Sequence, residues 1–352
     1  MTQHSSTKID TQSIPSDTPI VLTIAGSDSG GGAGIQADIK AMSATGSFAC
    51  SVITAITSQN TQGVSAIFPI PLEHVASQLD AVFTDLNIVA VKVGMLADSQ
   101  TIRVVADKIK QYQPKHLVID PVMVATSGDL LLENSAITTL KQELIPLADI
   151  ITPNLPEGAA LTGKAVPESE AEMQDMIEDL RALGAKAVLL KGGHLEKDEN
   201  SNDLLILPTT SALISAKRFP TKNTHGTGCT LSSAIASFLA QGNTLPEAVD
   251  LGKQYISRAI AHADDLTKVR GADWPTPRDN VIFELGLFMG RLGRARAILM
   301  EPREEKVKLP SDLAGITTIP YHFERIEDAA ASLGPACNRL RDHMNALGAN
   351  NG

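Results

Sequence analysis

The residues with the clearest chemical potential lie in the segment N-T-H-G-T-G-C, from Asn223 to Cys229. After this turn, apolar residues recur with the i, i+3, i+4, i+7, i+8 spacing of one helical face: Leu231, Ala234, Ile235, Phe238 and Leu239. Glycines let backbone amides approach an anion closely, and a helix N-terminus adds roughly half a positive charge at the same place. The segment therefore predicts a binding site for a transferring phosphoryl group.

Cys229 falls at the first position of this predicted helix. The field of the helix favours the thiolate, which could act as a base toward a substrate hydroxyl. A tight loop in which Cys229 packs as a small hydrophobic residue fits the G-T-G-C turn equally well. Both interpretations stay open on local grounds.

A second glycine-rich segment, from Gly26 to Gly34, precedes a helical pattern that includes Ile35, Ile39 and Met42. It matches neither G-x-x-x-x-G-K-[ST] nor G-x-G-x-x-G, so neither a P-loop nor a dinucleotide fingerprint is supported. We expect this segment to bring backbone close to a flat ligand. Asp38, one turn into the helix, could accept hydrogen bonds from a ring amino group, and a solvated first-turn charge is the alternative.

Oxygen ligands and a cation follow other apolar runs. Asp120, Asn154 and Glu157 offer the sparse carboxylate and amide set that Mg²⁺ uses together with water and substrate phosphates. The same residues could instead form a turn at Asp120 and a helix cap at Asn154 and Glu157. Lys191, followed by two glycines, could neutralise phosphate charge, or it could be an ordinary solvated lysine.

The elements that must position these residues are short apolar strands alternating with amphipathic stretches. The candidate strands are Ile20 to Ile24, Ile88 to Val93, Leu117 to Ile119, Ile150 to Thr152 and Ala187 to Leu190. Helices are expected around Leu79 to Leu86, over 134 to 145 and over 170 to 183. This alternation predicts an α/β fold with a mostly parallel sheet covered on both faces. Ligands of such sheets bind beyond the carboxyl ends of the strands, where the special residues lie.

Composition narrows the possible partners. The chain has 352 residues and a net charge of -10, which disfavours nonspecific attraction to nucleic acid or to anionic lipid. Its three cysteines form no C-x-x-C pair, and no apolar run reaches the ~18 residues of a membrane span. Residues 1 to 18 are expected to be a flexible tail without a signal peptide. We therefore expect a cytoplasmic protein that binds neither nucleic acid nor membrane.

The ordered set of motifs resembles a known enzyme family. The motifs are I-A-G-S-D-S-G-G-G-A-G-I-Q-A-D, T-S-Q-N-T-Q-G-V, K-V-G-M-L, D-P-V-M-V-A-T-S-G, T-P-N-L-P-E, K-G-G-H and N-T-H-G-T-G-C-T-L-S. Together they are similar to hydroxymethylpyrimidine/phosphomethylpyrimidine kinases of thiamine biosynthesis, in the ribokinase superfamily. The resemblance implies a three-layer ribokinase-like domain over residues 19 to 270. It also implies a homodimer that phosphorylates a pyrimidine hydroxymethyl group with ATP and Mg²⁺, and then the monophosphate.

The resemblance also assigns roles to residues. It places the pyrimidine against Gly26, Asp38, Gln59, Met95 and Val122. The ATP phosphates would be surrounded by Lys191, Asn223, Thr224, Gly226, Thr227 and Gly228. Asp120 and Glu157 would lie near Mg²⁺, partly through water, and Cys229, Gly226, Gly228 and Lys191 would be catalytic. The implied reaction is an in-line attack of the hydroxymethyl oxygen on the γ-phosphorus, with the developing charge held by loop amides, Lys191 and Mg²⁺.

The kinase resemblance stops after Asp265, where A-D-D-L-T-K-V-R-G-A-D-W-P replaces the usual Gly-His-Gly-Pro ending. We place a module boundary near 270 to 276. Residues 276 to 346 resemble the second half of nucleotide-binding, TIR-like domains, in which a Glu at the Glu284 position is associated with NAD cleavage. Half of an α/β domain cannot bury both faces of its sheet, which favours an inactive remnant over an NAD-cleaving module for this partial α/β appendage.

Two alternative functions follow from these features. A pyridoxal-type kinase is one, since pyridoxal also carries a ring hydroxymethyl group. The other is a nucleotide-sensing protein, in which the C-terminal module carries the activity and the kinase part only binds a ligand.

Overall fold

The computed structural model describes residues 18–60, 63–123, 134–195, 199–221, 224–261, 267–269, 272–274, 298–302, 317–321, 337–340 and 342. The chain divides into two compact units, Met1–Ala263 and Asp264–Gly352. Asn223, Glu284 and residues 1–17 of the predicted tail lie outside the described residues.

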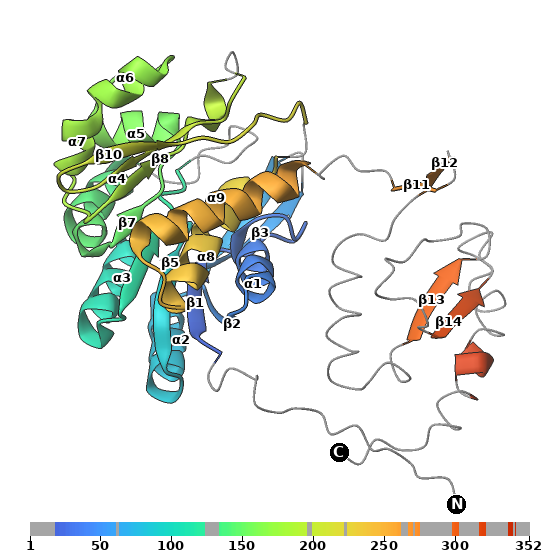
Figure 1. Ribbon diagram of the computed structural model, residues 1–352. Helices are drawn as coiled ribbons and strands as arrows, with labels where there is room; N and C mark the ends of the chain where they lie inside the picture. Colours follow the sequence, from blue (N-terminus) through green and yellow to red (C-terminus); the bar gives the residue numbers. More distant parts are fainter. Residues whose placement is uncertain are drawn as a thin grey trace, which may run out of the picture. The chain divides into compact units, whose positions relative to one another are not determined.

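The first unit is built on an eight-stranded sheet with the order β10-β9-β8-β7-β6-β5-β1-β2 (Figure 1). Its strands are β1 (Ile20–Ala25), β2 (Phe48–Ile53), β5 (Ile88–Val93), β6 (His116–Ile119), β7 (Ile150–Ile151), β8 (Val188–Leu190), β9 (Asp203–Ile206) and β10 (Ser211–Ile214). The pairings from β2 to β8 are parallel, and those of β9 and β10 are antiparallel. The mostly parallel sheet expected from the sequence is confirmed.

Helices cover both faces of this sheet (Figure 1). One layer consists of α1 (Gly34–Ala44), α8 (Thr227–Ala240) and α9 (Leu245–Ala261). The other contains α2 (Leu72–Asp85), α3 (Ser99–Tyr112), α4 (Asn134–Thr139), α5 (Leu155–Thr162), α6 (Glu170–Asp175) and α7 (Ile177–Arg181). A π-helical turn, η2 (Leu140–Leu144), and two 3-10 turns, η3 (Ile145–Leu147) and η4 (Gly192–His194), complete the set. The result is the three-layer arrangement of ribokinase-like proteins.

The two-residue periodicity of the strands divides the core into two parts. In β1, Val21 packs with α8 and α9, whereas Leu22 packs with the layer of α2 and α3. Both side chains are fully buried. Strands buried on both faces need continuous apolar runs, which is why β1, β5 and β6 were recognisable in the sequence.

Other elements differ from the sequence-based expectation. The helix expected over 134 to 145 changes from α to π geometry at Leu140, and the one over 170 to 183 divides at Met176. A separate hairpin, β3 (Ala55–Asn60) paired with β4 (Gly63–Pro69), was not predicted. Its side chains are largely exposed, so it lacks the buried apolar run of a core strand.

The second unit contains two short strand pairs among its described residues. The antiparallel pair is β11 (Thr267–Val269) with β12 (Ala272–Trp274), and the parallel pair is β13 (Ile298–Pro302) with β14 (Thr317–Tyr321). A parallel pair requires a crossover connection, which is typical of α/β folds. The pair therefore agrees with an α/β appendage at the C-terminus.

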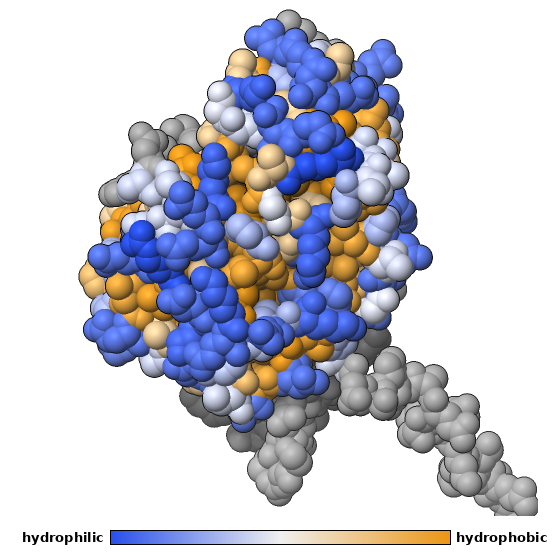
Figure 2. Space-filling model, turned by 90° about the vertical axis from the view of Figure 1, so that its left-hand side faces the viewer, coloured by the Kyte–Doolittle hydropathy of each residue, from blue (hydrophilic) through white to orange (hydrophobic). Residues whose placement is uncertain are grey.

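The surface of the molecule is largely polar on the face shown in Figure 2, where hydrophilic residues surround smaller apolar areas. Among the described residues, no helix combines the length and the apolar character needed to cross a membrane.

Candidate active site

A row of polar residues continues the apolar rows of the central strands toward their carboxyl ends. Val21, Ala90, Val118, Ile150 and Leu189 face α8 and α9 from five neighbouring strands. The residues two positions later in the sequence are polar, and they are, in the same order, Thr23, Lys92, Asp120, Thr152 and Lys191. Because side chains alternate with a period of two, these five residues point to the same side as the apolar row. The sheet thus gathers two lysines, an aspartate and two threonines below the start of α8.

Lys191 and Asp120 form the centre of this group. Lys191 Nζ lies 2.8 Å from Asp120 Oδ1, and the two side chains are only 14% and 3% exposed. Thr152 Oγ1 donates to the same oxygen at 2.9 Å. Burial opposes the charged form of Asp120, but the charges of Lys191 and Lys92 outweigh it and lower the pKa of this carboxyl. Lys191 is therefore a buried, paired cation, and the alternative of a solvated lysine is wrong.

The glycine turn lies directly against this ion pair. A Cβ atom at Gly228 would be 3.2 Å from Lys191 Nζ and 3.6 Å from Asp120 Oδ2. Gly226 is the N-cap of α8 and has a φ of 79°, the left-handed conformation that glycine adopts most easily. Among the described residues, no side chain caps the first turn of α8. The helix therefore presents backbone N–H groups beside a lysine, which is the environment that an anion requires.

Thr224 and Thr227 close the turn locally. The backbone N–H of Thr227 donates to the carbonyl of Thr224 at 3.3 Å, and its hydroxyl donates to the same oxygen at 3.0 Å. Thr224 is exposed and Thr227 is half-buried. Both lie at the rim of the turn, on the side open to solvent.

Cys229 is the third residue of α8 rather than the first. Loss of solvation raises the pKa of its thiol to about 11, although the charge of Lys92 acts in the opposite direction. The sequence argument that the helix field favours the thiolate is thus outweighed by the removal of water. The side chain is partly exposed, so it remains accessible from the site as a thiol.

Glu157 has two roles in the structure. With Asn154 it forms a capping box at α5, in which the Asn154 N–H donates to Glu157 and the Glu157 N–H donates to Asn154, both at 2.8 Å. The interpretation as a helix cap is therefore confirmed. Burial raises the pKa of Glu157 to about 7, with the charge of Asp120 contributing and that of Lys191 opposing. Glu157 thus lies close enough to the ion pair to interact with it electrostatically.

Asp38 is fully buried, and its carboxylate has no free acceptor position. Oδ1 accepts from Lys92 at 2.8 Å and from Ser233 at 2.7 Å, and Oδ2 accepts from Lys92 at 2.9 Å and from Thr23 at 2.6 Å. Two oxygens offer about four lone-pair sites, and all are used. The expectations of a solvated charge or of a free acceptor for a ring amino group are both corrected. Asp38 instead ties α1 to β1, β5 and α8.

The other residues expected to hold a ring lie around the first glycine segment. A Cβ atom at Gly26 would come within 2.6 Å of Met95 Cε, so Gly26 and Met95 are in direct contact. The backbone N–H of Gln59 donates to Ser29 Oγ at 2.8 Å, and the Gln59 side chain accepts from Thr57. Val122 is half-buried, two residues after Asp120. Gly26, Met95 and Val122 follow the carboxyl ends of β1, β5 and β6, whereas Gln59 lies on the β3–β4 hairpin.

Three important residues were not predicted from the sequence. Lys92 is 0% exposed and pairs with Asp38, whose charge raises the pKa of Lys92 against the opposing effect of burial. A lysine inside the apolar run I-V-A-V-K-V was a usable signal, because a buried charge needs a partner. Asp28 and His225 form a contact at 3.0 Å between the two glycine segments. Nothing in their spacing, 197 residues apart, indicated this contact.

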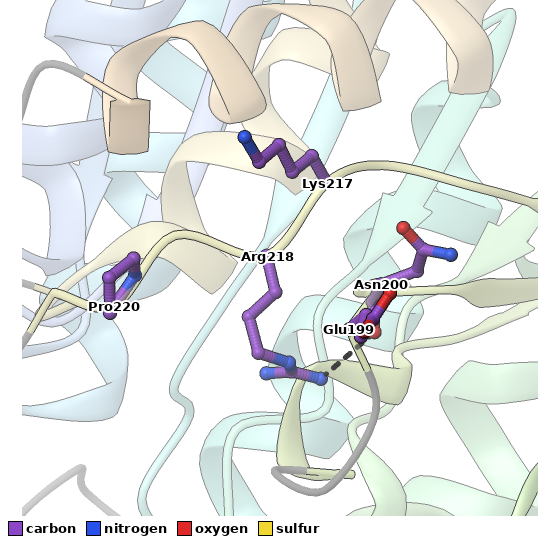
Figure 3. Close-up of a pocket in the computed structure, with 5 residues that line it drawn as sticks. All are labelled: Glu199, Asn200, Lys217, Arg218 and Pro220. Atoms are coloured by element: carbon purple, nitrogen blue, oxygen red, sulfur yellow. Dashed lines mark hydrogen bonds between the residues drawn. The ribbon is translucent and has the colours of Figure 1, made fainter.

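A surface hollow of about 590 Å³ lies at Glu199, Asn200, Lys217, Arg218 and Pro220 (Figure 3). None of the predicted site residues lines it. The Arg218 guanidinium donates to the carbonyls of Gly193, Leu195 and Asn200 at 2.8, 2.8 and 3.2 Å. The hollow therefore borders the turn that follows Lys191, and its arginine is occupied in holding that turn.

Comparison with known proteins gives a separate result for the C-terminal region. The family model described as "CAP12/Pycsar effector protein, TIR domain" matches residues 244–322. The predicted fusion to a TIR-like segment is therefore confirmed. The match begins at Thr244, immediately before α9 of the first unit and earlier than the residue 276 expected from the motifs.

The larger part of the chain matches a different family model, "Phosphomethylpyrimidine kinase", over residues 28–273. A hydroxymethylpyrimidine/phosphomethylpyrimidine kinase of Rhizobium meliloti is 53% identical over 249 residues, covering 71% of this chain and 93% of that protein. The crystal structure of a phosphomethylpyrimidine kinase from Clostridium difficile has 45% identity and a TM-score of 0.61, covering 69% of this chain and all of that one.

An ADP complex of Bacillus subtilis pyridoxal kinase is also similar, with 35% identity and a TM-score of 0.64 over 68% of this chain and 90% of that one. The match to the phosphomethylpyrimidine kinase model extends from Asp28 past the end of α9 to Asp273 in β12, and it includes every residue of the polar row except Thr23. Fold, site and sequence thus agree, and the chain belongs to the phosphomethylpyrimidine kinase family.

Proposed function

We propose that this protein transfers the γ-phosphoryl group of ATP to the hydroxymethyl oxygen of 4-amino-5-hydroxymethyl-2-methylpyrimidine, and then phosphorylates the monophosphate. The observation that carries this proposal is the Lys191–Asp120 pair, which lies against Gly228 at the uncapped start of α8. Kinases require little covalent chemistry from the protein. They need positioning and stabilisation of charge, which a buried lysine and helix amides supply.

The residues act on the transferring group from two sides. The amides of Gly226 and Gly228 face the phosphate oxygens at the start of α8, and Lys191 approaches from the end of β8. When phosphate arrives, Lys191 exchanges part of its contact with Asp120 for a contact with the more strongly charged phosphate. Cys229, with its thiol protonated, lies beside the attacking hydroxyl and contributes mainly to its orientation.

The pyrimidine ring lies against the first glycine segment in this proposal. Gly26 provides close backbone approach, Met95 an apolar surface, Gln59 an amide for the ring nitrogens and Val122 a side wall. Asp38 supports the pocket from below through Lys92 and does not touch the ring. The same site serves both steps, because the monophosphate can replace the hydroxymethyl group near the amides of α8.

Mg²⁺ fits the donor set of this site. Asp120 and Glu157 are hard oxygen donors, and the ion prefers one or two carboxylates together with water and phosphates. The carboxyl oxygen Oδ2 of Asp120 faces Gly228, where the phosphates are expected. When bound, the ion would neutralise phosphate charge, and Asn223 would add a polar contact from the neighbouring turn.

A homodimer is proposed through the exposed side of the β3–β4 hairpin. Ile56 and Phe68 are cross-strand partners with 51% and 63% of their surfaces exposed. A directly opposed apolar pair on one face of a hairpin gains from being covered by a second copy. Sedimentation of Phe68→Ser should show a shift toward monomer relative to the wild type, and an unchanged dimer would reject this surface.

The remaining organisation is also a proposal. We place a tail at 1–18, the kinase domain at 19–270 and a partial TIR-like module at 276–346. We also propose that the enzyme is cytoplasmic and binds neither nucleic acid nor membrane. The net charge of -10 supports the absence of these partners, because it disfavours attraction to polyanions and to anionic lipid.

The decisive experiment compares two substrates on the full chain. ATP consumption is measured with the hydroxymethylpyrimidine and with pyridoxal, and kcat/KM is determined for each. The pyrimidine should be preferred. A preference for pyridoxal would assign the chain to the alternative vitamin-kinase activity that one structural relative carries in its name.

A nucleotide-sensing role is tested separately in the C-terminal module. NAD loss that disappears in Glu284→Ala would support it. If the wild type leaves NAD unchanged and Glu284→Ala retains pyrimidine phosphorylation, the kinase is the activity of the chain.

A further inference from the structure

The two glycine segments of the site are joined by a side-chain contact that the kinase chemistry does not itself require. His225 Nε2 lies 3.0 Å from Asp28 Oδ2, with side-chain exposures of 19% and 0%. Asp28 belongs to the segment expected to hold the ring, and His225 immediately precedes Gly226, the N-cap of α8. The contact therefore connects the ring side of the site with the phosphate side.

Asp28 is held in place independently of His225. Its carboxylate accepts from the backbone N–H groups of Gly30, Gly32 and Ala33 at 2.8, 3.0 and 2.8 Å. Its own N–H donates to Gln36 Oε1 at 2.8 Å. These bonds fix the loop around the carboxylate, so His225 meets an acceptor that is already oriented.

The backbones of the two segments also touch. A Cβ atom at Gly226 would lie 1.6 Å from the carbonyl oxygen of Gly32, and one at Gly32 would lie 2.5 Å from Cδ2 of His225. Such spacing leaves no room for any side chain at either glycine. The two loops therefore pack directly against each other, and the side chain of His225 contacts Asp28 across the interface between them.

We propose that the contact between His225 and Asp28, called the clasp below, fixes the position of the ring-binding loop (Gly26 to Gly34) relative to the phosphoryl-transfer turn (Asn223 to Cys229). Both are positioning residues, since neither is expected to touch the reacting atoms. This inference rests on the proposed kinase function, because register matters only if ring and phosphate bind on opposite sides of the clasp. In-line transfer is sensitive to displacements of about 1 Å, which can reduce the rate ~10²-fold.

The kinetic test uses the full chain with saturating ATP and three forms of the protein: wild type, His225→Ala and His225→Gln. Glutamine can donate to Asp28 through an amide nitrogen at the end of a side chain of similar reach. We expect kcat to fall about 10²-fold in His225→Ala, with the KM for the pyrimidine changed less than about threefold. His225→Gln should recover kcat to within about tenfold of the wild type.

A double variant tests whether the two residues act through one contact. Asp28→Asn should lower kcat in the same way, and adding it to His225→Ala should cost little more than the larger single effect. Independent, multiplying losses would overturn the clasp. So would a His225→Ala variant within threefold of the wild type, equal activities of the Ala and Gln variants, or a change confined to KM.

Hydrogen exchange provides a test that does not depend on catalysis. In the unliganded protein, His225→Ala should accelerate amide exchange in both segments, 30–33 and 226–229, whereas His225→Gln should not. Unchanged exchange in both segments would overturn the clasp. If the wild type transfers no phosphate to the pyrimidine, the proposed function fails, while the exchange result still decides whether the clasp exists.

Discussion

Replacing Lys92 with methionine tests the assignment of Asp38 as a structural residue. The change keeps most of the side-chain volume and removes the charge. It leaves the Asp38 carboxylate buried, with hydrogen bonds from Thr23 and Ser233 only. Removing one partner of a buried ion pair destabilises a protein by about 3–5 kcal/mol, because the remaining charge is uncompensated.

Thermal unfolding of the full chain measures this effect. For a domain of this size, about 1 kcal/mol corresponds to a shift of roughly 2–4 °C. Lys92→Met should therefore lower the Tm of the kinase transition by roughly 6–20 °C. Lys164→Met is the matched control, since Lys164 and Asp179 are 3.2 Å apart with exposures of 54% and 39%. An exposed pair of this kind contributes at most about 1 kcal/mol.

Equal shifts in Lys92→Met and Lys164→Met would refute the reasoning. A second comparison separates the two roles considered for Asp38. If Asp38 is structural, Asp38→Asn lowers the Tm, and combining it with Lys92→Met recovers part of the loss from Lys92→Met alone. An Asp38→Asn variant with unchanged Tm and a strongly raised KM for the pyrimidine would instead return Asp38 to the ring-binding role.

Three further predictions concern the turn and its neighbours. Because the pKa of the Cys229 thiol is raised to about 11, Cys229→Ala should lose about 10²-fold or less in kcat near pH 7.5; a loss above ~10⁴-fold would restore the base role. Gly226→Ala should abolish phosphoryl transfer, because the new methyl group would clash with Gly32. Gly242 is the control: it also has a positive φ, but no atom lies within 4 Å of its Cβ position, so Gly242→Ala should lose only about 1–2 kcal/mol of stability and keep kcat. The pKa of Glu157 is about 7 in the folded protein against an ordinary 4.5, so the folded state binds one more proton than the unfolded state between these pH values, and the contribution of Glu157 to stability falls as pH rises from 4.5 to 7. Glu157→Gln keeps the capping box and should flatten this part of the profile of Tm against pH. Parallel profiles for the wild type and the variant would contradict this prediction.

The parts of the fold that were predictable are those with strong local signals. Strand β5 was predicted with its observed bounds, because its run of Val and Ile is apolar on both faces. The antiparallel strands β9 and β10 and the β3–β4 hairpin were missed. The side chains of β10 and of the hairpin are exposed or mixed and carry little periodic signal. Strand β9 is fully buried, but its four residues are too few for periodicity to distinguish a strand from a helix.

The sequence predicted which residues belong to the candidate site better than it predicted what each of them does. Asp120 and Lys191 follow β6 and β8, the two strands that flank β7, so their approach at one edge of the sheet was deducible from sheet geometry. The choice of Asp38 as a partner of Lys92 was not, because it depends on a pairing between α1 and β5 that no local pattern encodes. The same holds for Cys229, whose pKa depends on burial rather than on its place in the helix.

The central claim is that the first unit transfers phosphate from ATP to the pyrimidine twice. Phosphorus NMR of the full chain with ATP and the hydroxymethylpyrimidine follows this directly, with Lys191→Met as the control that lacks the cation at the transfer site. The wild type should give a phosphomonoester signal that is then replaced by a diphosphate signal, and the variant should give neither. ATP that remains unconsumed in the wild type, or phosphate released without a pyrimidine product, would contradict it.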